Sequence, residues 1–221
     1  MENKIKPNIS QFLLFILLII IGIVLYVLLF SKEPVENKTP EASSSASMKN
    51  KKYDTQPAMT IDKNKKYTVT LQTSKGDIAV ELFAQETPIA VNNFVFLARD
   101  GFYDGTFFHR IVKGFMIQGG DPQGNGSGGP GYKFNDEKIT RDYKRGIVAM
   151  ANSGPNTNGS QFFIMHKDYE LPKNYVIFGQ VVKGIEAVDV IADVQTVDNG
   201  YKEKSAPTEK VTIDKVTVTE K

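Results

Sequence analysis

The apolar residues that follow position 66 are divided among many short segments, and this division restricts the fold more than any other feature of the sequence. The first two segments begin at Tyr67 and at Ile78, and they alternate apolar and polar residues on either side of a turn at residues 74–77 that contains Gly76. Such a pattern predicts a β-hairpin. Further strands are expected at residues 146–150, 161–165, 176–182 and 210–219. In the last of these the apolar residues change register, so we expect a bulge near Asp214 and Lys215.

Two other segments have the apolar spacing of amphipathic helices. Thr87 and Pro88 suit the start of the first helix and Gly101 suits its end, because these residue types are favoured at those positions. The second helix is expected over residues 184–194. Many short strands, with helices that do not alternate with them, predict a mainly β fold in the form of a closed antiparallel β-barrel.

The N-terminal part of the sequence has a different character. Residues 12–30 contain no charged side chain, and a helix of this length would span about 29 Å, close to the thickness of the hydrocarbon core of a bilayer. Lys4 and Lys6 precede it, so the positive-inside rule predicts a cytoplasmic segment at residues 1–11 and an extracytoplasmic remainder. A cleaved signal peptide is the alternative, but its apolar region is usually shorter. We expect a single-pass anchor in the cell membrane, with the lipid bilayer as its partner.

Residues 31–60 are rich in Pro, Ser, Lys and Glu and contain few large apolar residues. A segment of this composition cannot bury enough surface to offset the entropy lost on ordering it. We therefore expect a disordered extracytoplasmic linker here and a folded domain over residues 61–221.

The composition excludes several classes of site. The sequence has no cysteine and two histidines, so disulfides, thiolate metal sites and a zinc site are not expected. A net charge of +2 with both signs interspersed does not indicate nucleic-acid binding. Residues 124–129 match a dinucleotide-binding pattern, but Pro130 and Gly131 prevent the helix that must follow it, so we expect a surface loop at the edge of the site. We predict a monomeric domain with no metal and no cofactor.

Two stretches carry the residues expected to form the functional site. Residues 107–121 read FFHRIVKGFMIQGGD, and residues 150–164 read MANSGPNTNGSQFFI. In the first stretch Arg110 precedes an apolar group and an amide, Gln118. Taken alone, this pattern could be a surface cation beside core aromatic residues, because arginine is seldom buried without a partner.

Both stretches, and the spacing between them, resemble the cyclophilin family of peptidyl-prolyl cis/trans isomerases. The first is similar to the family's FHRxxxGFMxQGGD signature and the second to its MANxGPNTNGSQFFI signature. The resemblance runs from about residue 67 to the C-terminus. It implies an eight-stranded barrel with a helix at each end, isomerase activity, and proline-containing polypeptides as substrates. With the expected anchor, it indicates a bacterial, membrane-anchored form.

The resemblance also implies roles for individual residues. Arg110 matches the catalytic arginine, Gln118 matches a position that holds the substrate backbone or orients the arginine, and His109 matches the neighbouring histidine, for which a structural role is at least as reasonable as a catalytic one. Residues that match the proline pocket are Phe115, Met116, Phe163 and Leu171. Residues that match positions along the substrate backbone or the adjoining groove are Ala151, Asn152, Ser153, Thr157, Asn158 and Gln161.

Two positions depart from the best-known eukaryotic members of the family. Those members have a tryptophan shortly before the position of Leu171. This chain has no tryptophan, and either Tyr169 or Glu170 occupies the corresponding position. Where they have a histidine, this chain has Tyr175, which keeps an aromatic wall and a hydroxyl group. We expect both changes to affect affinity and selectivity more than the reaction itself.

The expected reaction needs no nucleophile. Rotation about an X-Pro bond crosses a barrier of about 18–20 kcal/mol because amide resonance must be broken, and unaided it takes tens of seconds or longer. A guanidinium, charged at any relevant pH, can donate to the proline nitrogen as it becomes pyramidal. We expect an isomerase that assists the folding of exported proteins at the outer face of the cell membrane. A non-catalytic, proline-peptide-binding chaperone module on the same fold is the alternative.

Overall fold

The computed structural model describes residues 51–221. The expected cytoplasmic segment at 1–11, the expected anchor at 12–30 and the larger part of the expected linker lie outside the described residues. Among the helices of residues 51–221, none is both long enough and apolar enough to cross a bilayer.

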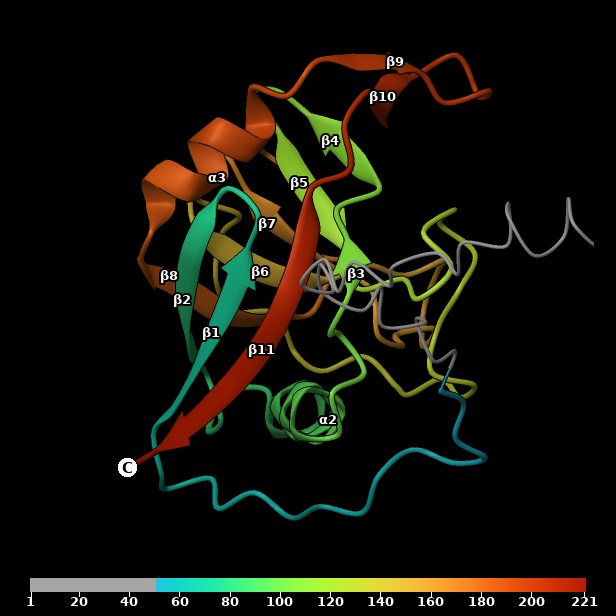
Figure 1. Ribbon diagram of the computed structural model, residues 1–221. Helices are drawn as coiled ribbons and strands as arrows, with labels where there is room; N and C mark the ends of the chain where they lie inside the picture. Colours follow the sequence, from blue (N-terminus) through green and yellow to red (C-terminus); the bar gives the residue numbers. More distant parts are fainter. Residues whose placement is uncertain (1–50) are drawn as a thin grey trace, which may run out of the picture. The chain divides into compact units, whose positions relative to one another are not determined.

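The strands of residues 51–221 form one large antiparallel sheet and one small hairpin (Figure 1). The strands of the large sheet are β1 (Tyr67–Thr73), β2 (Gly76–Leu82), β3 (Thr106–Phe107), β4 (Arg110–Val112), β5 (Met116–Gly119), β6 (Ile147–Met150), β7 (Phe162–Met165), β8 (Ile177–Lys183) and β11 (Thr212–Glu220). Their order in the sheet is β3, β11, β1, β2, β8, β6, β7, β5, β4. The separate hairpin pairs β9 (Thr196–Asp198) with β10 (Lys204–Pro207).

The large sheet is curled but not closed, which corrects the expected closed, eight-stranded barrel. Within residues 51–221 the sheet has nine strands, and its edge strands β3 and β4 are not paired with each other. The chain itself crosses the gap between these edges. The backbone N–H of Phe108 donates to Val211 beside β11, and that of His109 donates to Gln118 of β5. Because these two residues turn from one edge to the other, they cannot form the ladder that would close a barrel.

The first hairpin and the bulge in the last strand agree with the sequence pattern. β1 and β2 pair along their whole length around a short turn before Gly76. Between Ile213 and Lys215 the register with β1 shifts by one residue, so Asp214 is the extra residue of a bulge. As a result, both Ile213 and Val216 are buried although they lie in different alternation registers.

Helices α2 (Pro88–Arg99) and α3 (Ile185–Ala192) form at the expected places, α2 below the sheet in Figure 1 and α3 beside its upper part. Thr87 is the N-cap residue of α2, but its hydroxyl donates to the carbonyl of Ile177 at 3.1 Å instead of capping the helix. The carboxylate of Glu137 instead accepts two N–H groups of the first turn, at 2.8 and 2.9 Å.

Apolar side chains pack on both faces of the central strands. The main core contains the buried residues of α2 and α3 together with one alternating set of strand residues. The opposite set forms a second group, which we call the outer cluster. The outer cluster consists of Met116, Tyr143, Ile147, Ala149, Phe163, Met165 and Ile177, with Phe83, Val112, Phe115, Ile139, Ala151, Leu171 and Tyr175 packed against it. Because strand residues alternate between faces, Met116 and Phe163 lie outside the main core, although Ile117 and Phe162 lie within it.

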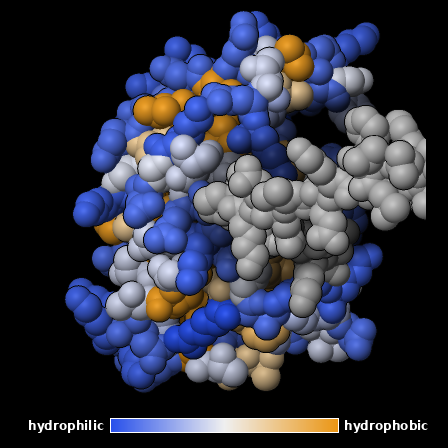
Figure 2. Space-filling view, viewed as in Figure 1, coloured by the Kyte–Doolittle hydropathy of each residue, from blue (hydrophilic) through white to orange (hydrophobic). Residues whose placement is uncertain are grey.

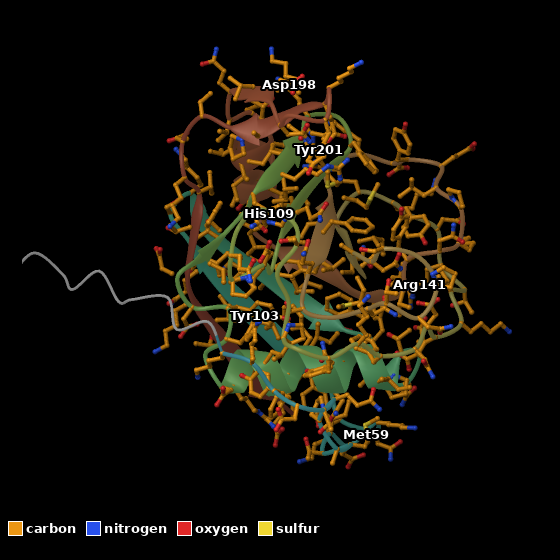
Figure 3. The ribbon with its side chains drawn as sticks, turned by 90° about the vertical axis from the view of Figure 1, so that its right-hand side faces the viewer. Met59, Tyr103, His109, Arg141, Asp198 and Tyr201 are labelled. Carbon is orange, nitrogen blue, oxygen red and sulfur yellow. The ribbon has the colours of Figure 1, made fainter. Side chains whose placement is uncertain are left out.

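The described residues that precede β1 lie against the domain. The ring of Tyr53 packs edge-on against Phe96 of α2 at 5.2 Å between ring centroids, and its N–H donates to Pro130. Ile61 is buried, and the side chain of Asn92 in α2 accepts from the N–H groups of Thr60 and Ile61. Figure 3 shows Met59 on the outer side of α2. Tyr53 and Thr60, which lie in the segment expected to be a linker, thus contact the domain, and the expected boundary at residue 60 stays a prediction.

The described surface on the face seen in Figure 2 is mostly hydrophilic, with small and separate hydrophobic patches. Most of the larger apolar side chains of residues 51–221 are buried, while a few, among them Tyr201 and Val182, are exposed. The curled sheet therefore positions the site through its outer cluster and the loops at its edge.

Candidate active site

Strands β4 and β5 place Arg110 and Gln118 directly opposite each other. Nη1 of Arg110 donates to Oε1 of Gln118 at 3.1 Å and lies 3.7 Å from the sulfur of Met116. Met116 belongs to the outer cluster and is almost fully buried. One nitrogen of the guanidinium is therefore held above an apolar surface.

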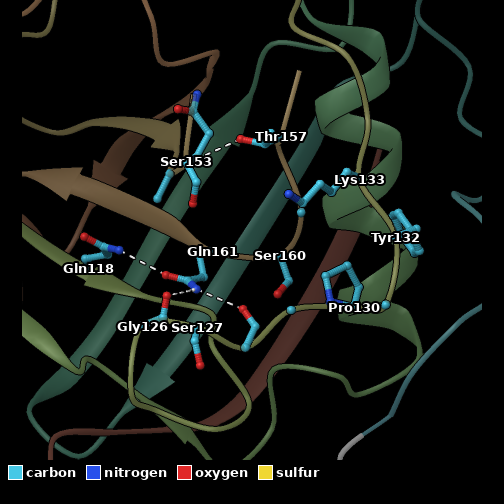
Figure 4. Close-up of a pocket in the computed structure, with 16 residues that line it drawn as sticks. Gln118, Gly126, Ser127, Pro130, Tyr132, Lys133, Ser153, Thr157, Ser160 and Gln161 are labelled. Atoms are coloured by element: carbon cyan, nitrogen blue, oxygen red, sulfur yellow. Dashed lines mark hydrogen bonds between the residues drawn. The ribbon is translucent and has the colours of Figure 1, made fainter. Parts of the chain in front are cut away.

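A chain of amide hydrogen bonds continues from this pair to the glycine-rich loop (Figure 4). Nε2 of Gln118 donates to Oε1 of Gln161 at 3.0 Å. Nε2 of Gln161 donates in turn to the carbonyls of Gly126 and Gly128, at 3.0 and 2.9 Å. Both amide orientations follow from these partners. The position of the guanidinium is thus linked to the position of the loop.

Asp121 holds the glycine-rich loop in place. Its side chain is fully buried, and its carboxylate accepts backbone hydrogen bonds from residues 123, 125, 126 and 128 at 2.7 to 3.2 Å. A Cβ atom on Gly128 would lie 1.8 Å from this carboxylate, so the close approach requires glycine. Asp121 was not predicted from the sequence to organise this loop. Its place before a proline and a run of glycines was the available signal.

The residues expected to form the proline pocket come together in the outer cluster. Phe163 meets the ring of Tyr175 edge-on, with 5.5 Å between centroids. Phe115 packs against Tyr169 at 4.7 Å, and Leu171 lies against the same cluster. Tyr169 thus supplies an aromatic surface beside the pocket, at the position where the sequence departs from well-known family members.

The residues expected to hold a substrate backbone line a groove beside this pocket. The groove has a volume of about 830 Å³, and its walls include Ala151, Asn152, Ser153, Thr157 and Gln161 on one side and residues 126–133 on the other. The glycine-rich stretch is therefore a loop at the edge of the site, as expected from Pro130 and Gly131. The amide of Asn152 is itself engaged with the carbonyl of Asn174 at 2.8 Å. Asn158 does not line the groove: it is buried and bonded to Phe134 and Asp136.

His109 lies on the other side of Arg110. With Arg110 and Tyr201 it lines a second cavity of about 620 Å³, and Figure 3 shows it beneath the hairpin that carries Tyr201. Neither ring nitrogen has a hydrogen-bond partner among the described residues. Burial lowers the pKa of His109, an effect opposed by the charge of Asp121 and increased by that of Arg110. The lowered pKa keeps the imidazole neutral at neutral pH. Among residues 51–221, the imidazole makes no hydrogen bond to a residue of the expected proline pocket.

Glu203, between β9 and β10, contacts Arg110 and was not predicted from the sequence. Its carboxylate accepts from Nε and Nη2 of Arg110, both at 2.7 Å. The hydrogen bonds from Arg110 lower the pKa of Glu203 to about 2. The side chains of the pair are about one-third exposed, at 31% for Arg110 and 38% for Glu203. The surrounding sequence, YKEKS, gives no signal of such a role.

Comparison with known proteins agrees with this geometry. Residues 68–218 match the family described as "Cyclophilin type peptidyl-prolyl cis-trans isomerase/CLD". A peptidyl-prolyl cis-trans isomerase of Arabidopsis thaliana is 53% identical over 135 residues, which cover 58% of this chain and 84% of that protein. A probable peptidyl-prolyl cis-trans isomerase A of Mycobacterium leprae is 44% identical over 174 residues, covering 68% and 91%.

Solved structures show the same similarity. A crystal structure of a cyclophilin-type peptidyl-prolyl cis-trans isomerase from Cryptosporidium parvum superposes with a TM-score of 0.65 and 37% identity, covering 70% of this chain and 98% of that one. A second crystal structure of the Cryptosporidium isomerase, in the presence of the dipeptide Ala-Pro, gives a TM-score of 0.64 and 38% identity, covering 69% and 98%.

Proposed function

This chain belongs to the cyclophilin-type peptidyl-prolyl cis-trans isomerases, and we propose that its Arg110 is the group that accelerates rotation about the X-Pro bond. The chain catalyses this isomerisation and binds proline-containing peptides, as the family assignment establishes. The residue roles and the cellular setting go beyond that assignment. The observation that carries the proposal for Arg110 is the position of its Nη1, 3.7 Å from the sulfur of Met116 at the apolar pocket.

The chemistry requires an interaction that is stronger in the transition state than in the ground state. In the planar amide the nitrogen lone pair is delocalised, and it becomes available as the bond rotates. A guanidinium N–H directed at this nitrogen therefore forms its hydrogen bond mainly in the twisted state. A hydrogen bond to a charged group contributes about 1.5–3 kcal/mol, which corresponds to about 10-fold to 100-fold in rate.

The outer cluster supplies the apolar contact for the proline ring. Met116 and Phe163 are buried members of this cluster, Phe115, Leu171 and Tyr175 pack against it, and these five residues are the proposed contacts of the ring. Burying the three methylene groups of a proline ring contributes roughly 2 kcal/mol of binding free energy. This contact fixes the ring while the chain before it rotates.

The adjoining groove holds the polypeptide on the other side of Gln118. Ala151, Asn152 and Ser153 line it, and Gln161 closes its end towards Arg110. Gln118 orients the guanidinium through its 3.1 Å hydrogen bond. His109 is assigned a packing role beside Arg110, because burial lowers the pKa of its imidazole and keeps it neutral.

Exchange of Phe115 for alanine tests the pocket. Phe115 is half-buried in the outer cluster, so Phe115→Ala is expected to weaken the binding of an X-Pro peptide by about 10-fold. Phe96→Ala is the matched control, because Phe96 is also half-buried but packs against the main core and Tyr53. Peptide affinity measured by titration should change less than about twofold for Phe96→Ala. Equal losses of affinity in the two variants would refute the assignment of the pocket.

We also propose that the enzyme acts on exported proteins at the outer face of the cell membrane. This setting rests on the apolar run at 12–30 and on the lysines that precede it. Protease added to intact cells should then degrade the domain at 61–221 while a cytoplasmic marker protein stays intact. Protection of the domain until the membrane is permeabilised would contradict the proposed orientation.

A further inference from the structure

The hairpin formed by β9 and β10 brings a carboxylate to the guanidinium at the site. Strand β10 lies beside β4, which begins with Arg110. Glu203 directly precedes β10 and is bonded to Arg110 twice, at 2.7 Å each. The hairpin is at the top of Figure 3, where Asp198 and Tyr201 are labelled. An element 93 residues away in sequence thus reaches the residue proposed as the catalytic donor.

The turn of this hairpin fixes the carboxylate before any substrate binds. Nδ2 of Asn199 donates to Glu203 at 3.3 Å and to the hydroxyl of Ser205 at 3.1 Å. Oδ1 of Asn199 accepts the N–H of Tyr201 at 2.8 Å, and the N–H of Asn199 donates to the carbonyl of Glu203 at 2.9 Å. In such turns the asparagine side chain bonds to the backbone two residues further on. Glu203 is therefore held by Asn199 of the same turn as well as by Arg110.

The donors of the guanidinium show what this contact does. A guanidinium has five N–H groups in a fixed planar fork. Glu203 takes the edge formed by Nε and Nη2, and Gln118 takes a hydrogen of Nη1. Glu203 holds one edge of the guanidinium and Gln118 holds Nη1, so rotation of the guanidinium plane about the Arg110 side chain would break these hydrogen bonds. The remaining end of the fork is directed over Met116, which lies 3.7 Å from Nη1.

The contact is better suited to orientation than to stability. An ion pair with about one-third of each side chain exposed adds little to the free energy of folding. A small misplacement of a catalytic group, by contrast, lowers a rate by a large factor. Glu203 also stays ionised at neutral pH, because the hydrogen bonds from Arg110 lower its pKa to about 2.

We propose that Glu203 is a positioning residue for the isomerisation: the β9–β10 hairpin holds the guanidinium of Arg110 by one edge so that its other end faces the proline pocket. This inference rests on the proposed role of Arg110 as the donor. Glu203 acts through Arg110 and does not touch the substrate's reacting atoms.

The test is a set of full-length variants assayed by exchange NMR on an X-Pro peptide, with peptide affinity measured separately. Glu203→Gln keeps the size of the side chain but replaces the paired carboxylate, so the catalysed rate should fall by about fivefold while the peptide Kd changes less than about twofold. Glu86→Gln is the matched control, because Glu86 makes the same two-bond pair with Arg141. It should leave the rate within about twofold of the unchanged chain.

The double variant Arg110→Ala/Glu203→Ala distinguishes positioning from a general structural effect. If Glu203 acts only through Arg110, the double variant should be as slow as Arg110→Ala alone. An additional loss in the double variant would overturn the inference, as would an unchanged or faster rate for Glu203→Gln. If Arg110→Ala itself keeps the full rate, the proposed donor role fails and this inference falls with it. If only the Glu203 variants keep the full rate, the donor role stands and the inference alone fails.

Discussion

Arg110 and Arg141 form ion pairs of nearly the same geometry in two regions of the molecule. Arg110 donates to Glu203 at 2.7 and 2.7 Å, and Arg141 donates to Glu86 at 2.8 and 2.6 Å. The exposed fractions are also similar, at 31% and 38% for the first pair and 41% and 39% for the second. Both glutamates have a lowered pKa, mainly because of the hydrogen bonds from the arginine.

The two guanidinium groups differ in what lies on their other side. That of Arg141 covers the ring of Phe83, with 3.9 Å from its central carbon to the ring centroid. That of Arg110 bonds to Gln118 and reaches the sulfur of Met116 at the pocket. The comparison teaches that the ion pair alone does not make a site. Arg110 differs from Arg141 in that its remaining N–H groups are directed at Gln118 and Met116, and the proposed function rests on this difference.

The largest difference in kcat/KM between the two pairs is expected when each arginine is exchanged for lysine. A lysine offers a single point charge and cannot bond to Glu203 and Gln118 in the same plane. We expect Arg110→Lys to lower kcat/KM for an X-Pro peptide by about 100-fold. Arg141→Lys should change it by less than about twofold. Similar losses in the two variants would mean that the catalytic effect does not depend on the fork of Arg110.

The partners on the other side of the two guanidinium groups provide the next comparison. Gln118→Ala removes the bond to Nη1 of Arg110 and leaves Gln161 without its donor, so kcat/KM should fall by about tenfold. Phe83→Leu changes the surface beneath Arg141 and should leave kcat/KM within about twofold. Thermal unfolding of both variants checks that they are folded. The comparison fails if Phe83→Leu is the slower enzyme.

Lowering the pH should decrease the contribution of both ion pairs to the stability of the fold. A carboxyl whose pKa is lowered by folding stabilises the protein above its ordinary pKa, and this stability is lost as pH falls through the folded value. For Glu203 the window lies between its ordinary 4.5 and about 2. Urea unfolding should therefore show that the stability gap between the unchanged chain and Glu203→Gln shrinks from pH 6 to pH 2.5. A gap that grows in acid would contradict the assigned pairing.

Salt should have the smallest effect on either pair. Raising the ionic strength from about 0.1 to 1 M shortens the screening length from about 10 to 3 Å. The bonded atoms are already in contact, so we expect kcat/KM to fall by less than about threefold and the stability to change by less than about 0.5 kcal/mol. A tenfold fall in kcat/KM would instead mean that long-range charge, and not contact, orients Arg110 or attracts the peptide.

The sequence predicted most of the local structure because the controlling signals are local. The β1–β2 hairpin, the bulge at Asp214 and both helices follow from alternation, helical spacing and glycine or proline positions. Arg110, Gln118, Phe163 and Gln161 also lie together as expected. Alternation within the strands accounts for this, since it selects the face that carries Met116 and Phe163.

Other features depend on contacts between distant segments, which the sequence pattern does not record. The prediction of a closed barrel was wrong, because the edge strands β3 and β4 are joined through residues 108 and 109 and do not pair with each other. Glu203 was missed because only the folded hairpin brings it to Arg110. The packing of Tyr53 against α2 was also not predicted, because its contact with Phe96 joins two segments that are distant in the sequence. The roles assigned to the site residues and the membrane setting stay predictions.

We propose that Arg110 acts on the transition state of the rotation and not on the binding of the peptide. One measurement tests this most directly: the exchange rate between the cis and trans forms of an X-Pro peptide, together with the peptide Kd, for the full-length chain and for Arg110→Ala. For Arg110→Ala we expect a catalysed rate that is lower by about 100-fold or more, with a Kd that changes by less than about threefold. A Kd that rises as much as the rate falls would show that Arg110 serves only to bind the substrate, and the proposed donor role would be wrong.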